Sequence, residues 1–201
     1  MIIHKVATVY DLDLKQLPEQ FRSVLTRQEV KALRTGPKYF ATLAGPDSPE
    51  WLQRVVRECS ESDFTLKFET WDDNPFTPHF QFLCEGFPDL TLPRTKKIRS
   101  DVPEFLRRIY KVVGSFEVHD FNLGPANSLG LVSDSWLGVV PDSAIDPKTA
   151  VPFLETSSGK YLCYLTDGGG AWLESAEFRR VENLEHEVAQ YFEALSEGTQ
   201  D

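Results

Sequence analysis

The chain has 201 residues, of which 41% are hydrophobic and 26% charged, and its formal net charge is −10 at pH 7. This apolar content is enough for a substantial core and excludes an intrinsically disordered chain. The acidic balance argues against nucleic acid as a partner, because neutralising phosphates requires a positive surface.

The number and spacing of the cysteines and the length of the apolar runs indicate the cellular compartment. The cysteines Cys59, Cys84 and Cys163 are odd in number and far apart, so we expect buried reduced thiols rather than disulfides. No apolar run reaches the roughly 20 residues of a membrane span. The N-terminus also lacks the apolar core and cleavage site of a secretory signal. The sequence therefore predicts a soluble, cytoplasmic chain without a membrane partner.

Helical spacing dominates the first part of the chain. Apolar residues recur every three or four positions from Leu12 to Arg34, with a break near Pro18. A second helix is expected after Ser48, as its cap, with Pro49 in the first turn. One apolar face then runs from Trp51 to Cys59.

The periodicity then changes to two, which is typical of strands. Phe64 to Phe68 and His79 to Cys84 are expected to pair, with a loop over Trp71-Asp72-Asp73-Asn74-Pro75 between them. The carboxylates of this loop could bind a metal or act as an acid–base pair. The ligand spacing of a calcium loop is absent, so a plain turn is favoured.

The second half begins with a helix and continues with strands. Asp101 and Glu104 form a capping-box-like start to a helix over Val102 to Val112. Strand-like segments follow at Phe116–His119, Trp136–Val140, Val151–Leu154, Tyr161–Leu165 and Ala171–Glu174. Asp167-Gly168-Gly169-Gly170 is expected to turn the last two into a hairpin.

An amphipathic helix from Leu184 to Leu195, capped by Asn183, closes the chain. Helices precede and follow the predicted strands, but strands and helices do not alternate regularly along the chain. The predicted class is therefore α+β, with a mixed or antiparallel sheet covered on one side by helices.

No motif has convincing catalytic or metal-binding spacing. The four histidines, His4, His79, His119 and His186, are not spaced as zinc ligands are. The glycines at 168–170 lack the lysine and hydroxyl residue of a phosphate-binding loop, and no serine lies in a nucleophile elbow. We therefore expect no catalytic residue, no metal and no cofactor, and a protein that acts by binding a macromolecule rather than as an enzyme.

Charge is distributed unevenly along the chain. The segment from Arg94 to Lys111 contains seven basic and two acidic residues. The segment from Ala171 to Asp201 contains eight acidic and two basic residues. An acidic C-terminal face would speed association with a basic partner. The alternative is that these charges only maintain solubility.

Three stretches after Pro93 follow one another in a suggestive order. The first is a proline-started helix from Val102 to Gly114. The second is a proline–aromatic strand, Val151–Leu154, followed by a glycine turn and the cysteine-centred strand within Ser158–Leu165. The third is the closing helix. This order resembles the SUKH superfamily, the Smi/Knr-like proteins. The likeness suggests an N-terminal α+β extension over residues 1–90, packed on a SUKH-like domain over 91–201.

Many proteins of this superfamily are bacterial immunity proteins. The resemblance thus implies stoichiometric binding and neutralisation of a cognate toxin, such as a nuclease, without catalysis. A basic toxin would suit the acidic C-terminal face. Candidate contact residues are Trp136, Trp172, Glu174, Glu177, Glu182 and Glu185. The two tryptophans could be exposed anchors of the contact, although a core position is more usual for tryptophan. Two alternatives stay open: a small hydrolase or nucleotide-handling enzyme built on the carboxylates of Trp71 to Asn74, and a regulatory protein-binding scaffold.

Overall fold

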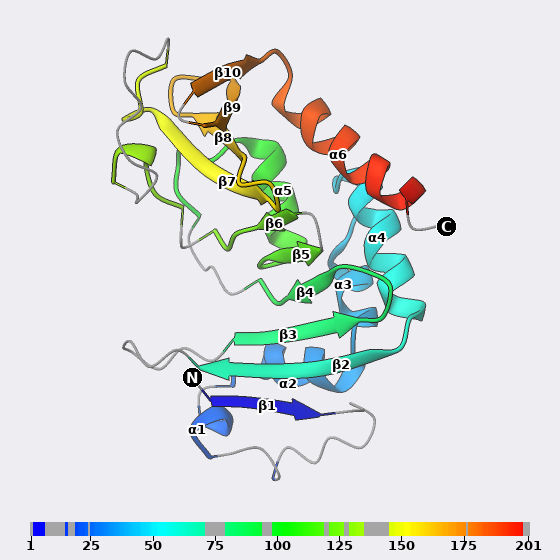
Figure 1. The fold of residues 1–201 in the computed structure, drawn as a ribbon. Coiled ribbons are helices and arrows are strands. Elements are labelled where there is room, and N and C mark those ends of the chain that lie inside the picture. Colours follow the sequence, from blue (N-terminus) through cyan, green and yellow to red (C-terminus); the bar gives the residue numbers. More distant parts are fainter. Residues whose placement is uncertain are drawn as a thin grey trace. The chain divides into compact units, whose positions relative to one another are not determined.

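A computed structural model describes residues 2–6, 15, 19–23, 25–70, 79–93, 98–118, 121–126, 129–134, 145–175 and 177–198. The chain divides into two compact units, one formed by Met1–Pro93 with Lys111–Val113 and the other by Arg94–Tyr110 with Gly114–Asp201. Each unit combines helices with antiparallel strands (Figure 1), so the expected α+β class is confirmed. No helix within the described ranges is long and apolar enough to cross a membrane.

The first unit contains four strands that pair in chain order. They are β1 (Ile2–Val6), β2 (Phe64–Thr70), β3 (His79–Cys84) and β4 (Asp89–Thr91). Its helices are α1 (Glu19–Arg22), α2 (Arg27–Thr35), α3 (Lys38–Leu43) and α4 (Glu50–Glu61). The pairing of β2 with β3 is as predicted, whereas β1 and β4 were not predicted.

Helix α2 begins at a capping box. The expected helix between Pro18 and Arg34 is therefore interrupted a second time, between α1 and α2. The Thr26 side chain accepts a hydrogen bond from the Glu29 backbone N–H at 3.2 Å, and the Glu29 carboxylate accepts one from the Thr26 N–H at 2.7 Å. This reciprocal bonding starts a new helix at Arg27. The predicted cap of α4 is also wrong: Pro49 is the N-cap residue, and no side chain caps the helix.

The core of the first unit lies between β2–β3 and the helices. Phe82 is fully buried and contacts Phe40 of α3 edge to face, with ring centroids 5.4 Å apart. Its ring also lies 5.9 Å from that of Phe64. Cys59 of α4 and Cys84 of β3 are buried and free, as predicted for core thiols.

The second unit contains six strands that also pair in chain order. They are β5 (Phe116–Val118), β6 (Phe121–Leu123), β7 (Ala150–Thr156), β8 (Tyr161–Leu165), β9 (Gly170–Glu174) and β10 (Glu177–Val181). The helices are α5 (Glu104–Val112) and α6 (Leu184–Gly198), with a short 3-10 turn, η2 (Val132–Asp134). Strands β6 and β10 were not predicted, and the expected strand Trp136–Val140 lies outside the described residues.

Helices α5 and α6 pack against one face of this sheet. Phe105 of α5 meets Phe153 of β7 with ring centroids 6.4 Å apart, and Phe192 of α6 meets Phe116 of β5 at 4.9 Å. On the opposite face, η2 and a nearby loop cover an apolar cluster formed by Val132, Ile145, Ala150, Cys163, Leu165, Ala171 and Leu173. The partly buried rings of Tyr161 and Phe178 pack against the edge of this cluster.

A glycine turn joins β8 to β9, and an asparagine caps α6. Gly168 and Gly169 have φ angles of 109° and 83°, which glycine adopts without strain, so the predicted turn between β8 and β9 is confirmed. Asn183 caps α6 as expected, because its side-chain oxygen accepts a hydrogen bond from the His186 N–H at 3.0 Å.

The start of α5 differs from the prediction. The helix begins at Glu104 rather than at Val102, and the Asp101 carboxylate accepts two hydrogen bonds from the Arg99 guanidinium, at 3.0 and 2.6 Å. Arg107 of α5 donates to the carbonyls of Val102, Arg99 and Ser100. Two arginines therefore hold the loop before the helix.

Candidate partner-binding surface

The β9–β10 hairpin brings two of the candidate acidic residues together. The strand register places Glu174 directly opposite Glu177, so a connection of two residues joins the strands. Ser175 in that connection has a φ of 50°, which is uncommon for a residue other than glycine. Both glutamates are exposed. Like charges directly opposite on neighbouring strands destabilise a sheet.

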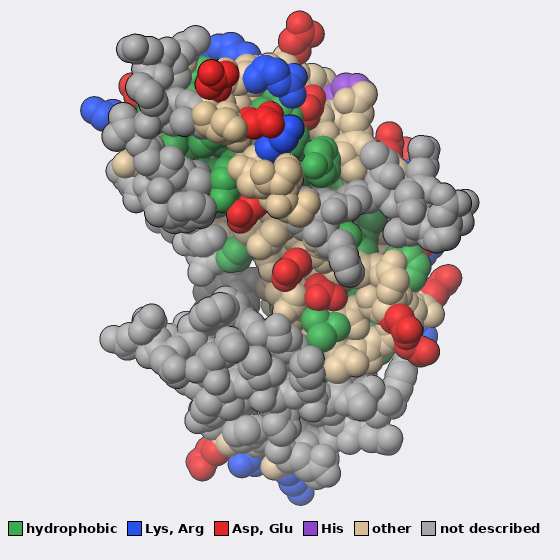
Figure 2. Space-filling model, viewed as in Figure 1, with side chains coloured by type: hydrophobic (Ala, Val, Ile, Leu, Met, Phe, Trp, Pro, Cys, Tyr) green, Lys and Arg blue, Asp and Glu red, His purple; other side chains and the backbone are tan. Residues whose placement is uncertain are grey.

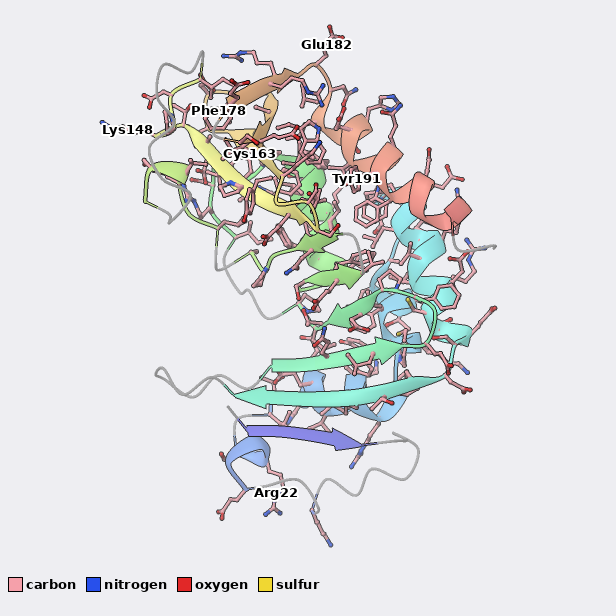
Figure 3. All side chains as sticks on the ribbon, viewed as in Figure 1. Arg22, Lys148, Cys163, Phe178, Glu182 and Tyr191 are labelled. Atoms are coloured by element: carbon pink, nitrogen blue, oxygen red, sulfur yellow. The ribbon has the colours of Figure 1, made fainter. Side chains whose placement is uncertain are left out.

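Lys160, just before β8, forms an ion pair with one of these two glutamates. Its Nζ lies 2.9 Å from a carboxylate oxygen of Glu174. Within the described residues Glu177 has no ion pair, and neither does Glu182, which is exposed just after β10 and points away from its unit (Figure 3). Two carboxylates, one at each end of β10, are therefore available to an incoming cation.

Glu185, in the first turn of α6, is already engaged. It accepts a hydrogen bond from the Arg108 guanidinium of α5 at 2.7 Å. This pair joins the basic segment around α5 to the acidic C-terminal segment. The two charge runs in the sequence thus partly neutralise each other within one unit.

Trp172 is not an exposed anchor, which corrects the expectation for this residue. It is 6% exposed, because it lies on the face of β9 that α6 covers. Its indole N–H donates to the Glu187 carboxylate at 2.6 Å, and its ring centroid lies 5.6 Å from that of Tyr191. Trp172 therefore attaches the hairpin to α6. The other candidate tryptophan, Trp136, lies outside the described residues.

Basic residues also belong to this surface, although the sequence analysis did not single them out. Arg179 and Arg180 are exposed on β10, and Arg179 lies 3.8 Å from the Glu187 carboxylate. Figure 2 shows acidic and basic side chains interspersed on the part of this unit that carries β10. The surface is thus mixed in charge, with Glu177 at the hairpin end of β10 and Glu182 after its other end.

The residues considered for chemistry do not form a described site. Trp71 to Asn74 and His119 lie outside the described residues, and His186 is exposed on α6. Where the structure describes the chain, no three His, Cys, Asp or Glu side chains are grouped to hold a metal ion. Burial raises the pKa of the Cys163 thiol to about 12, so this thiol is protonated and unreactive at neutral pH.

Comparisons of the chain with protein-family models, curated proteins and solved structures found no match. The resemblance to the SUKH superfamily therefore stays a prediction from the sequence.

Proposed function

We propose that the protein acts by binding a basic protein partner at the end of the β9–β10 hairpin. The observation that supports this most is the pair Glu174 and Glu177, which lie opposite each other on the two strands. Among the described residues, only Glu174 of this pair has an ion-pair partner. Such a pair costs the free chain about 0.2–1 kcal/mol, and a lysine or arginine from a partner would relieve that cost.

The conformation of the β9–β10 hairpin places the two carboxylates side by side and is stabilised by contacts with α6. Directly opposite residues of paired strands project from the same face, so the two carboxylates can accept hydrogen bonds from one guanidinium. Glu182 adds negative charge a few residues later. Trp172, two residues before Glu174, fixes β9 to α6 through Glu187. A preorganised site loses less entropy on binding.

The specific form of this proposal is an immunity protein that neutralises a cognate bacterial toxin by stoichiometric binding. It rests on the sequence resemblance to the SUKH superfamily together with the unbalanced carboxylates of the hairpin. A basic toxin, such as a nuclease, would be attracted by these carboxylates, mainly through a faster association rate.

The test is to co-express the chain with the secreted toxin encoded beside its gene, and to measure cell survival and co-purification. The proposal expects protection and a one-to-one complex, both weakened in the double variant Glu174→Gln/Glu177→Gln. Glu61→Gln/Glu85→Gln is the matched control, because both residues are exposed acids in the other unit. Equal loss in the two double variants, or no toxin that the chain protects against, would overturn the proposal.

A further inference from the structure

Strand β10 is the last strand of its sheet, and among the described residues it pairs only with β9 (Figure 1). Glu177, Arg179 and Arg180 are exposed along it, whereas Phe178 and Val181 are half-buried. In an antiparallel pair, the backbone N–H and C=O groups of every second residue point away from the partner strand. The outer side of β10 therefore carries backbone groups that another strand can pair with.

We propose that this edge binds the same edge of a second copy of the chain, so that two β10 strands pair antiparallel about a two-fold axis at Phe178.

The faces are set by the pairing with β9. Glu177 and Arg179 lie opposite Glu174 and Trp172, on the face covered by α6. Phe178 lies opposite Leu173, on the face of the apolar cluster. In a continuous sheet, directly opposite residues share a face. A two-fold axis must therefore pass through a residue of β10 rather than between two residues.

The charges of β10 then select one register. An axis at 177 would place Glu177 opposite itself, and an axis at 179 or 180 would place an arginine opposite itself. An axis at Val181 would pair only that residue within the strand, because β10 ends there. An axis at Phe178 instead places Glu177 of each copy opposite Arg179 of the other. It gives two favourable pairs and no like-charge pair directly opposite. Like charges are destabilising and opposite charges stabilising at these positions, so this register is preferred.

The contacts at the axis agree with this register. Two Phe178 rings would meet there, and each already packs on the apolar cluster of its own copy. Aromatic pairs are among the cross-strand contacts that stabilise sheets. The residues that flank a two-residue hairpin connection form a hydrogen-bonded pair, here Glu174 and Glu177. Hydrogen bonding alternates from there, so the backbone groups of Phe178 point outward, toward the second copy.

This inference does not depend on the proposed function. The dimer needs Arg179 and the outer edge of β10, whereas partner binding needs the carboxylates of the hairpin. Both involve Glu177, so a bound partner and the dimer would compete for that residue. The variant Arg179→Glu separates them, because it would remove the dimer and leave every hairpin carboxylate in place.

The experiment is sedimentation equilibrium on the full chain, with circular dichroism to establish folding. The wild type is expected to dimerise in a concentration-dependent way, and Glu177→Arg and Arg179→Glu are each expected to weaken the dimer by about tenfold or more. Mixing these two variants should restore association, since each Arg–Arg or Glu–Glu clash becomes an Arg–Glu pair. The double variant Glu177→Arg/Arg179→Glu should also dimerise.

Arg180→Glu is the control, because in this register only residues 177–179 of the two β10 strands lie opposite one another, so residue 180 meets no charge of the other strand. It should leave the dimer within about threefold of wild type. A wild type that stays monomeric up to about 1 mM overturns the proposal. So does a dimer that is unaffected by the single reversals, or a mixture of the two variants that fails to associate.

Discussion

Glu174 and Glu177 lie directly opposite each other across the β9–β10 hairpin, and Lys160 lies 2.9 Å from Glu174. The hairpin thus holds a charge pair that lowers the stability of the free chain. Proteins give up stability in this way where a site serves binding rather than folding. The stability and the binding of variants at this pair should therefore change in opposite directions.

Glu177→Thr should raise the free energy of unfolding by about 0.2–1 kcal/mol, because it removes the like charge opposite Glu174 and places a strand-favouring residue there. Urea denaturation in dilute solution measures this change. Glu182→Thr, which follows the strand and has no cross-strand partner in the described register, is the control and should leave stability within about 0.5 kcal/mol. A Glu177→Thr variant less stable than wild type contradicts the interpretation.

Gly170 is needed for close approach between β9 and α6 rather than for an unusual φ angle. A Cβ at this position would lie 2.5 Å from Cδ1 of Leu184 and 3.2 Å from the Cys163 carbonyl oxygen. Gly170→Ala should therefore destabilise the chain by about 1–3 kcal/mol. Gly130→Ala is the control, because no atom lies within 4 Å of its added Cβ. Equal melting temperatures of the two variants would show that Leu184 of α6 does not pack closely against Gly170.

Two buried tyrosines should respond oppositely to the loss of their hydroxyl groups. Tyr110 donates a hydrogen bond to the Gly124 carbonyl at 2.9 Å, whereas the Tyr164 hydroxyl has no partner among the described residues. Burial raises the pKa of Tyr164 to about 12, so the hydroxyl stays neutral. An unsatisfied buried group costs about 1–3 kcal/mol, so Tyr164→Phe should be neutral or stabilising.

Tyr110→Phe, in contrast, should cost about 1 kcal/mol, because it removes a satisfied hydrogen bond. Chemical denaturation of both variants makes the comparison. Destabilisation of Tyr164→Phe by as much as Tyr110→Phe would show that the Tyr164 hydroxyl is satisfied in solution.

The Arg99–Asp101 pair should make the loop before α5 sensitive to acid. The hydrogen bonds from Arg99 lower the pKa of the Asp101 carboxyl below its ordinary value of 3.8. A lowered folded-state pKa gives stability that is present above the unfolded pKa and is lost as the pH falls through the folded pKa. The difference in free energy of unfolding between wild type and Asp101→Asn should therefore shrink below pH 3.8. A difference that is independent of pH would mean that the pair adds no net stability.

The strands that could be predicted have an alternating or a continuously apolar pattern and are bounded by turn residues. Strands β8 and β9 are continuously apolar, and Gly168 and Gly169 permit the turn between them. Strand β10 was missed because Glu-Phe-Arg-Arg-Val has little apolar character, which is typical of an exposed edge. Strand β1 pairs with β2 across some sixty residues of sequence, and such pairing leaves no local pattern.

The candidate surface could be predicted only in part. The run of glutamates was visible in the sequence, but the facing of Glu174 and Glu177 depends on a two-residue turn that does not contain glycine. The burial of Trp172 depends on where Glu187 and Tyr191 of α6 lie, which no spacing within β9 reveals. The capping box at Thr26 and Glu29, in contrast, was readable from its four-residue pattern.

The most direct test uses the secreted toxin that the proposed function expects to be encoded beside the gene. The purified toxin is titrated, in a calorimeter, into wild-type protein and into Glu174→Gln/Glu177→Gln. Our account predicts one-to-one binding to the wild type, with affinity reduced by about tenfold or more in the double variant. It also predicts that salt weakens wild-type binding more than that of the variant. Equal affinity of the two proteins at low salt would contradict the claim that the hairpin carboxylates bind the partner.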